Sequence, residues 1–336
     1  MSSKKLDGLL ISKQVNVAYA AEMSVQIEAF LVVSPRVNYY ITDFRYLEEA
    51  RCTVSDSFKI IELKGSLSGI LKRIAKKNKI RKLGFEKTLT YGRYKKLKER
   101  VSYLKLIETS NLIEELRQIK DVAELSKIKQ AVSITSKAWK EFLKYLRSGS
   151  NLSRLTEKRM ADKLEFLLRK QGAVKSAFDI IAACGANISR PHAVPGQTQF
   201  KKSQPVLFDF GAVYQDYQSD VTRNFLINKP LGKYQKIYRV VQQAQALAIK
   251  AVKPGVRIGL IDNISRSYIV DKGFGKYFGH ALGHGIGLEV HEGPVITGKN
   301  KNRLVPGMVF SIEPGIYIPG WGGVRIEDMV LVTEKG

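Results

Sequence analysis

The sequence predicts an α+β chain of two domains, a smaller α/β domain over residues 1–115 and a larger α+β domain over residues 116–336. The length of 336 residues favours one large or two ordinary domains. Short apolar runs alternate with helical patterns in the first part of the chain. Two long helical patterns and then a strand-rich stretch fill the remainder, which is typical of an α+β domain.

The first domain is predicted from its alternating strand and helix patterns. Residues 29–42 hold two β-rich runs on either side of Ser34–Pro35–Arg36, which indicates two strands joined by a turn. Residues 67–78 and 90–101 have the apolar spacing of helices. Residues 82–86 lie between these helices and form a short predicted strand.

Two long helices are predicted next along the chain, over residues 111–149 and 151–172. Both segments have apolar residues at i, i+3 and i+4, and each ends near a glycine. A third helix is predicted over residues 233–252. The predicted strand segments are 178–185, 205–214, 218–227, 308–318 and 323–333.

The net charge of +25 raises the question of a polyanionic partner. The densest basic run, residues 71–82, contains no aromatic side chain that could stack on bases. Its apolar residues Leu71, Ile74 and Ile80 have partly helical spacing. The run therefore predicts a helix with a solvated basic face, and nucleic acid is not expected as a partner.

Several other features restrict the class of protein. No apolar run approaches the ~20 residues that a membrane helix needs, and the N-terminus has no secretory pattern. Cys52 and Cys184 are far apart in sequence, which fits small buried side chains in a reducing compartment. We expect a cytoplasmic protein that has no membrane partner.

Two acidic residues occupy a predicted hairpin over residues 206–226. Asp209 and Asp220 each lie among apolar residues, and their midpoint falls between Tyr214 and Gln215, where a turn is expected. Opposed residues on paired strands have Cβ atoms roughly 4.5–5.5 Å apart. Two buried like charges at that distance repel each other unless a proton or a cation lies between them.

A second predicted hairpin, over residues 310–331, repeats this pattern. Glu313 and Glu327 have their midpoint at Gly320, inside the turn-rich segment "PGWGG". Asp328 is next to Glu327 but points to the opposite face of a strand, so it is left out of the site.

The summed charge suggests what the four acids bind, since four carboxylates carry −4 and two divalent cations carry +4. Such ions accept carboxylate oxygens and neutral imidazoles as ligands. Two ions about 3.5–4 Å apart lower the pKa of a shared water molecule and hold the reacting group. The sequence therefore predicts a dinuclear hydrolytic centre.

The histidines are concentrated in two short segments. His280, His284 and His291 lie in "FGHALGHGIGLEVHEG" (278–293), and His192 lies in "SRPHAVPG" (189–196). Glycines on both sides of His284 allow backbone and ligand to approach closely. This setting favours His284 as a metal ligand, whereas the local sequence at His192 fits a substrate contact or a turn equally.

The chain resembles the pita-bread metallopeptidases, in the branch of aminopeptidase P, prolidase and creatinase. The matching segments are "SRPHAVPG", "LFDFGAVYQDYQSDVTRNF", "FGHALGHGIGLEVHEGP", "FSIEPGIY" and "GGVRIED". They occur in the family's order and spacing, and "YYITDFRYLEEA" (39–50) resembles the family's N-terminal domain. The resemblance implies a creatinase-type α/β domain over residues 1–115 and a pita-bread domain over residues 116–336.

The resemblance also implies the metal ligands. Asp209 would bind one metal ion, and Asp220 and Glu327 would bridge both. His284 and Glu313 would complete the second metal ion. The family uses Mn²⁺, Co²⁺, Zn²⁺ or Fe²⁺, and we expect Mn²⁺ before the other three.

Further residues match catalytic and supporting positions of the family. Glu313 matches the general base, and His192 and His291 match the histidines that contact the substrate and its transition state. His280 and Arg325 match positions that support the site in proline-specific members.

The leading hypothesis is an Xaa-Pro aminopeptidase that acts on proline-containing peptides as a homodimer. Methionine aminopeptidases generally lack the α/β N-terminal domain and the sequence "RIED", which favours the proline-specific branch. An Xaa-Pro dipeptidase is the alternative, because the motifs do not show how open the product side of the cleft is. A non-catalytic peptide- or RNA-binding member is a third hypothesis, which the retention of all five metal ligands disfavours.

Overall fold

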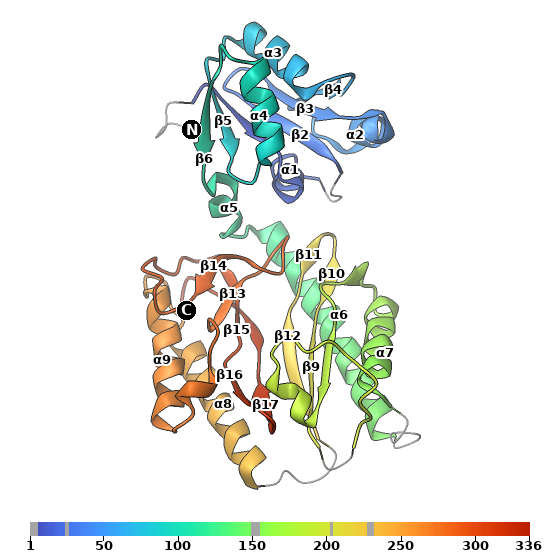
Figure 1. The fold of residues 1–336 in the computed structure, drawn as a ribbon, viewed down its shortest axis with the longest axis vertical. Helices are drawn as coiled ribbons and strands as arrows, with labels where there is room; N and C mark the ends of the chain where they lie inside the picture. Colours follow the sequence, from blue (N-terminus) through green and yellow to red (C-terminus); the bar gives the residue numbers. More distant parts are fainter. Residues whose placement is uncertain (1–5, 24–26, 149–154, 202–203, 227–231) are drawn as a thin grey trace. The chain divides into compact units, whose positions relative to one another are not determined.

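A computed structural model describes residues 6–23, 27–148, 155–201, 204–226 and 232–336 (Figure 1). The chain divides into two compact units, residues 1–117 and 118–336. The domain bounds expected at residues 115 and 116 stay a prediction. The first residues of the helix predicted over 151–172, and the end of the strand predicted over 218–227, lie outside the described residues.

The strands described in the first unit are β1 (Gly8–Ile11), β2 (Ala29–Val33), β3 (Asn38–Thr42), β4 (Phe58–Glu62), β5 (Lys82–Glu86) and β6 (Lys105–Thr109). They form one mixed sheet in the order β4-β3-β2-β1-β5-β6. β2 and β3 are antiparallel neighbours, so the predicted hairpin around Ser34–Pro35–Arg36 is confirmed. The pairs β3–β4, β1–β5 and β5–β6 are parallel.

Helices cover both faces of this sheet (Figure 1). The helical segments described are α1 (Gln14–Ala20), η2 (Phe44–Tyr46), α2 (Leu47–Thr53), α3 (Leu67–Asn78), α4 (Tyr91–Arg100) and α5 (Leu112–Arg117). Leu10 packs with α3 and α4, whereas Leu9 and Ile11 pack with α1, α2 and α5, because alternate strand residues point to opposite faces. α3 and α4 confirm both helices predicted in this unit.

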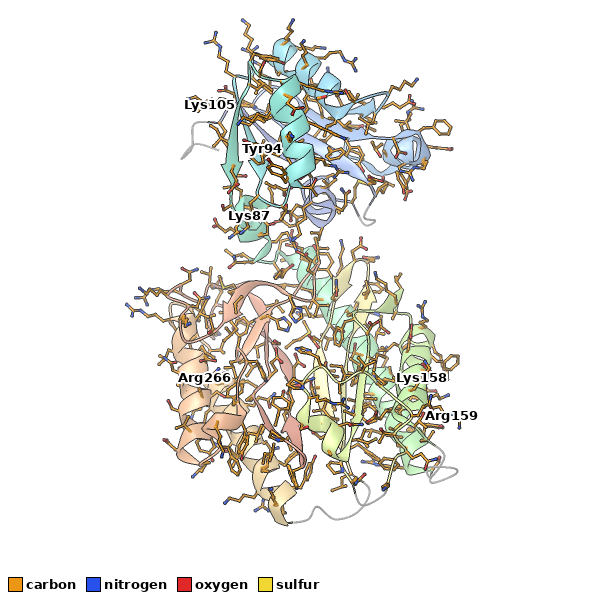
Figure 2. The ribbon with its side chains drawn as sticks, in the orientation of Figure 1. Lys87, Tyr94, Lys105, Lys158, Arg159 and Arg266 are labelled. Atoms are coloured by element: carbon orange, nitrogen blue, oxygen red, sulfur yellow. The ribbon has the colours of Figure 1, made fainter. Side chains whose placement is uncertain are left out.

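The densest basic run, residues 71–82, is helical as predicted up to Asn78, where α3 ends, and its last four residues lie beyond the helix. Leu71, Ile74 and Ile80 are buried in the core beneath α3, while the basic side chains of the run are exposed or half-buried. Figure 2 shows Lys87 and Lys105 of the same unit, which are also exposed. The charge of this segment is thus carried by a solvated surface.

The helices described in the second unit are α6 (Val122–Arg147), α7 (Glu157–Lys170), η4 (Gly185–Ser189), α8 (Gly232–Lys250), α9 (Ile258–Asp271) and η5 (Gly275–Tyr277). The single helix predicted over 111–149 is wrong, because α5 ends at Arg117 and α6 begins after Asp121. Asp121 and Glu124 form a reciprocal capping box, which starts a new helix at that point. α9 is a further helix that the sequence patterns did not predict.

The strands described in the second unit are β7 (Lys175–Ser176), β8 (Ile181–Cys184), β9 (Val206–Phe210), β10 (Ala212–Tyr214), β11 (Tyr217–Gln218), β12 (Val221–Phe225), β13 (Gly283–Gly285), β14 (Glu292–Ile296), β15 (Val309–Ile312), β16 (Gly315–Ile318), β17 (Gly322–Arg325) and β18 (Asp328–Leu331). α6 and α7 pack on β8, β9, β10 and β12, and α8 and α9 pack on β14 to β17. Figure 1 shows α7 and α9 at opposite sides of this unit, with strands between them. The two-halved arrangement is the predicted pita-bread domain.

The first predicted hairpin forms, but its register differs from the prediction. Asp209 lies opposite Thr222 rather than opposite Asp220. The turn is centred on Gln215 and Asp216, which both have positive φ, so the hairpin reverses one residue later than expected. Asp220 remains on the same face as Asp209, as its diagonal neighbour.

The second predicted hairpin has the expected register. Ile312 pairs with Asp328, and Gly315 pairs with Arg325, so Glu313 and Glu327 occupy opposed positions between the two short ladders. The turn at Gly320 has positive φ, which glycine adopts without strain. Both hairpins bring their acids to the space between the two halves of the unit.

Candidate metal centre

A cavity of about 1030 Å³ in the second unit contains the predicted site. Its walls include all nine residues singled out in the sequence: His192, Asp209, Asp220, His280, His284, His291, Glu313, Arg325 and Glu327. These residues come from both halves of the unit. The fold thus brings side chains that are up to 135 residues apart (327 − 192) into one pocket.

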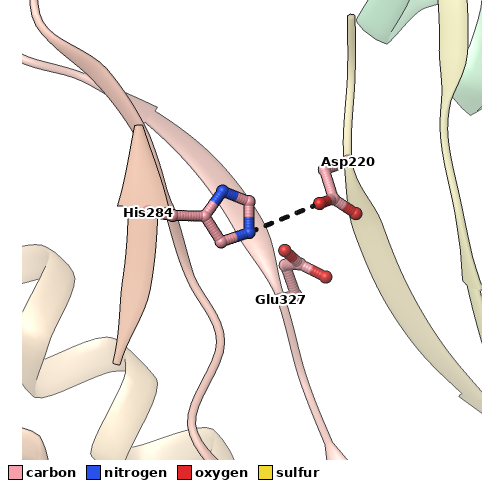
Figure 3. A group of neighbouring side chains, drawn as sticks. All are labelled: Asp220, His284 and Glu327. Atoms are coloured by element: carbon pink, nitrogen blue, oxygen red, sulfur yellow. Dashed lines mark ion pairs between the residues drawn. The ribbon is translucent and has the colours of Figure 1, made fainter. Parts of the chain in front are cut away.

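The acids of the pocket surround His284 on β13. Its Nε2 atom lies 3.6 Å from Oδ2 of Asp220 and 3.3 Å from Oε1 of Glu313. Asp220 and Glu327 are almost fully buried, with 4% and 1% of their surfaces exposed. Figure 3 shows Asp220, His284 and Glu327 pointing toward one common space.

Burial makes the charged state of these acids unfavourable. Burial and the nearby Glu327 raise the pKa of Asp220 well above its usual range. Burial and the nearby Glu313 do the same to the pKa of Glu327, and burial raises the pKa of Glu313 to about 7. Burial lowers the pKa of His284 to about 4, so its ring is neutral at pH 7 and able to act as a metal ligand.

The donor set fits divalent cations. Asp220, His284 and Glu327 each offer a ligand atom, and these atoms all lie within 4.8 Å of one another. Oδ1 of Asp209 and Oδ1 of Asp220 are buried and have no hydrogen-bond partner in the structure. Buried polar atoms are rarely left unsatisfied, and carboxylate oxygens with a neutral imidazole are ligands for Mn²⁺, Zn²⁺ and similar ions.

We predict that the metal-free chain loses stability as the pH rises from 7 to 9. The pKa of Glu313 is about 7 in the folded chain, against an ordinary value of 4.5, so its stabilising contribution is lost between about pH 4.5 and pH 7. The decline above pH 7 is expected from Asp220 and Glu327, because burial raises both of their pKa values well above the usual range. The lowered pKa of His284 has the opposite effect, but only below about pH 6.5.

Denaturant unfolding of the chelated protein checks this prediction. The free energy of unfolding should fall between pH 7 and pH 9, and saturating Mn²⁺ should abolish the decline. A metal-free chain whose stability is level or rises over this range would contradict the electrostatic account.

Arg325 connects the acids to the pocket wall. Its guanidinium donates to Oδ2 of Asp209 at 2.5 Å, to Oγ1 of Thr222 at 2.9 Å and to the Tyr317 hydroxyl at 3.0 Å. Thr222 donates in turn to Oε2 of Glu327 at 2.7 Å. One buried cation therefore orients two of the four acids, one directly and one through a hydroxyl group.

The remaining histidines of the pocket differ in burial. Nε2 of His280 lies 3.1 Å from the Tyr317 hydroxyl, and burial lowers the pKa of His280 to about 4. The His291 ring meets the His284 ring edge-on, with centroids 4.1 Å apart. His192 is exposed on the rim. His192 and His291 are thus available to a ligand in the pocket, whereas His280 belongs to its wall.

Sequence reasoning missed Thr222 and Tyr317. Strand alternation contained the signal for Thr222, which lies two residues after Asp220 and shares its face. No local sequence pattern indicated that Tyr317 would contribute to the site. Asp328, which was excluded, binds Arg223 and Gln245 and does not line the cavity.

Comparisons with known proteins agree with this geometry. Residues 126–334 match the model of metallopeptidase family M24, and residues 1–119 match the creatinase/prolidase N-terminal domain. The chain belongs to metallopeptidase family M24. The predicted family and the predicted class of enzyme, a metallo-exopeptidase, are confirmed, and membership of family M24 implies a dinuclear metal site.

Named relatives in family M24 cover nearly the whole chain. The chain is 35% identical over 340 residues to the Xaa-Pro dipeptidase of Pyrococcus horikoshii, which spans 100% of this chain and 93% of that protein. The structure matches that of Xaa-Pro dipeptidase from Bacillus anthracis with a TM-score of 0.93 and 38% identity, over 99% of this chain and 92% of that one. For X-Pro aminopeptidase from Thermotoga maritima the TM-score is 0.89 and the identity 34%, over 98% and 94%.

The structure also bears on membrane association. In the described part of this M24 chain, no helix has the length and apolar character that a membrane span requires.

Proposed function

We propose that this chain is an Xaa-Pro dipeptidase, which hydrolyses the bond between an N-terminal residue and a C-terminal proline. The observation that supports this proposal most strongly is the set of buried acids around His284. They occur in a chain that resembles named Xaa-Pro dipeptidases over nearly its whole length. The named relatives favour the alternative hypothesis over the leading one, since more of them are dipeptidases than aminopeptidases. We also propose a cytoplasmic location and a homodimeric state.

We further propose that Asp209, Asp220, His284, Glu313 and Glu327 hold two divalent ions, with Mn²⁺ placed first. The carboxylate oxygens without partners on Asp209 and Asp220 support this assignment. When bound, two such ions lower the pKa of a water molecule and polarise the scissile carbonyl.

Glu313 is the proposed general base. Its carboxylate lines the cavity, with Oε1 3.3 Å from Nε2 of His284, where it can accept a proton from the attacking water. Ser311 donates to Oε1 of Glu313 at 3.3 Å, which orients the carboxylate toward the cavity. The bond before proline is a tertiary amide, so its nitrogen needs a proton to leave, and Glu313 returns the proton it accepted.

His291 and His192 are the proposed contacts for the oxygen that gains charge during attack. Burial lowers the pKa of His291, so its ring is neutral and can donate a hydrogen bond without carrying a full charge. His192 lines the same cavity. Arg325 and His280 are proposed to hold the wall around these groups.

A comparison of two substrates tests the proposed function. With Mn²⁺ present, the protein should release alanine from Ala-Pro at least about 10-fold faster than from Ala-Pro-Ala, and a chelator should abolish both activities. Faster cleavage of the tripeptide would establish an aminopeptidase instead. Inactivity on both substrates with Mn²⁺, Co²⁺, Zn²⁺ and Fe²⁺ would contradict proline-specific hydrolysis.

A further inference from the structure

We propose that Glu157 is the positioning residue for His192. The inference rests on the proposed function, in which His192 contacts the substrate. Glu157 is the first residue of α7 and has no place among the pocket-lining residues. It is nevertheless 2% exposed, which is unusual for a carboxylate that forms no ion pair with a cation among the described residues.

The Glu157 carboxylate binds both ends of the loop that carries His192. Oε1 accepts hydrogen bonds from the Cys184 backbone N–H at 2.7 Å and from Nδ2 of Asn187 at 2.8 Å. Oε2 accepts one from the Gly196 backbone N–H at 3.1 Å. Residues 185–195 lie between the two bound amides, so one side chain joins the start of the loop to its end.

Backbone hydrogen bonds strengthen the same junction. The Glu157 N–H donates to the Thr198 carbonyl, and the Lys158 N–H donates to the Gly196 carbonyl, both at 3.0 Å. At the other side of the loop, Arg325 donates to the Pro191 carbonyl at 3.2 Å. The His192 backbone is therefore held between Glu157 at the base of the loop and the active-site arginine at its tip.

The His192 ring depends on this support because its own contacts are few. Among the described residues, none donates a hydrogen bond to the ring or accepts one from it, and the side chain is exposed. Its position over the cavity is then set by the backbone that carries it. Hydrogen bonds from N–H groups to a carboxylate are stronger than neutral ones, which suits Glu157 to hold this loop.

Glu157→Gln is the most informative substitution because it keeps the size of the side chain, removes the charge that strengthens its three hydrogen bonds and reverses one of them. The amide oxygen keeps an acceptor for the Cys184 N–H and Asn187, while the amide nitrogen faces the Gly196 N–H, donor against donor. Asp162→Asn, on the exposed face of the same helix, is the matched control. Asn187→Ala removes one of the three hydrogen bonds to Glu157 from the loop side. It replaces Glu157→Gln as the test variant if Glu157→Gln does not fold.

A double-mutant cycle with His192→Ala tests whether Glu157 acts through His192. Glu157→Gln should lower kcat/KM on the better of Ala-Pro and Ala-Pro-Ala about 10-fold in the wild type, but less than about 2-fold in His192→Ala. Mn²⁺ affinity should be unchanged in both backgrounds. Equal losses in the two backgrounds, or a His192→Ala variant as active as wild type, would overturn the proposal.

Amide hydrogen exchange gives a readout that needs no activity. Exchange across residues 184–196 should quicken in Glu157→Gln and Asn187→Ala, with α8 and α9 unchanged and Asp162→Asn like wild type. Unchanged exchange in this loop would overturn the inference even in an active enzyme. Absence of peptidase activity in the wild type, by contrast, would count against the proposed function alone.

Discussion

Glu327→Gln is expected to lower kcat/KM at least about 1,000-fold, equivalent to about 4 kcal/mol of transition-state stabilisation. The substitution keeps the size of the side chain and removes one negative charge from a largely buried cluster. Glu327 is 1% exposed and one of three residues whose ligand atoms converge within 4.8 Å. Loss of its charge should reduce bound Mn²⁺ from two ions per chain to one or none, measured by elemental analysis after dialysis.

Asp328→Asn provides the matched control for this prediction. Asp328 is the next residue, but its carboxylate pairs with Arg223 at 2.6 Å and lies outside the cavity. This variant should keep both Mn²⁺ ions and kcat/KM within about 3-fold of wild type, since a half-exposed pair contributes little. Full activity in Glu327→Gln, or equal losses in the two variants, would refute the assignment of Glu327.

Lys120→Met should destabilise the second unit by about 3–5 kcal/mol. The Lys120 ammonium and the Glu292 carboxylate form an ion pair at 2.7 Å, with side chains only 1% and 4% exposed. Removal of the cation leaves the charged Glu292 carboxylate, which lines the cavity and is only 4% exposed, without its lysine partner. Tryptophan fluorescence during urea unfolding reports on this unit selectively, because both tryptophans, Trp139 and Trp321, lie in it.

Two further variants show whether burial of the pair causes this loss. Lys120→Met combined with Glu292→Gln should recover part of the lost stability, because the buried charge is then removed as well. Lys158→Met breaks an exposed pair with Asp162, in which both side chains are 60% exposed, and should cost less than about 1 kcal/mol. A loss below about 1 kcal/mol in Lys120→Met would show that the pair is dispensable.

The placement of the acids was largely predictable from local sequence. The midpoint of Glu313 and Glu327 coincides with a glycine-rich turn, and the register follows directly. The register of Asp209 was missed by two residues because Gln215 and Asp216 both take up positive φ, which neither residue type makes obvious. The prediction that Asp209 and Asp220 share one strand face was nevertheless correct. The strand face decides whether an acid reaches the cavity.

Other parts of the site depend on contacts that local patterns do not encode. Arg325 and Thr222 are 103 residues apart, and only the packed fold shows that they bind each other. The same holds for Glu157 and the loop that it supports. α9 was missed for a different reason, since Arg257 at its N-cap makes no side-chain capping bond and the usual start signal is absent.

Anomalous diffraction from crystals grown with Mn²⁺ tests the central claim most directly. If the buried acids are tolerated because cations lie among them, two manganese peaks should appear in the cavity, within ligand distance of Asp209, Asp220, His284, Glu313 and Glu327. A map in which the cavity contains no manganese, while the four acids keep the positions described above, would contradict the claim.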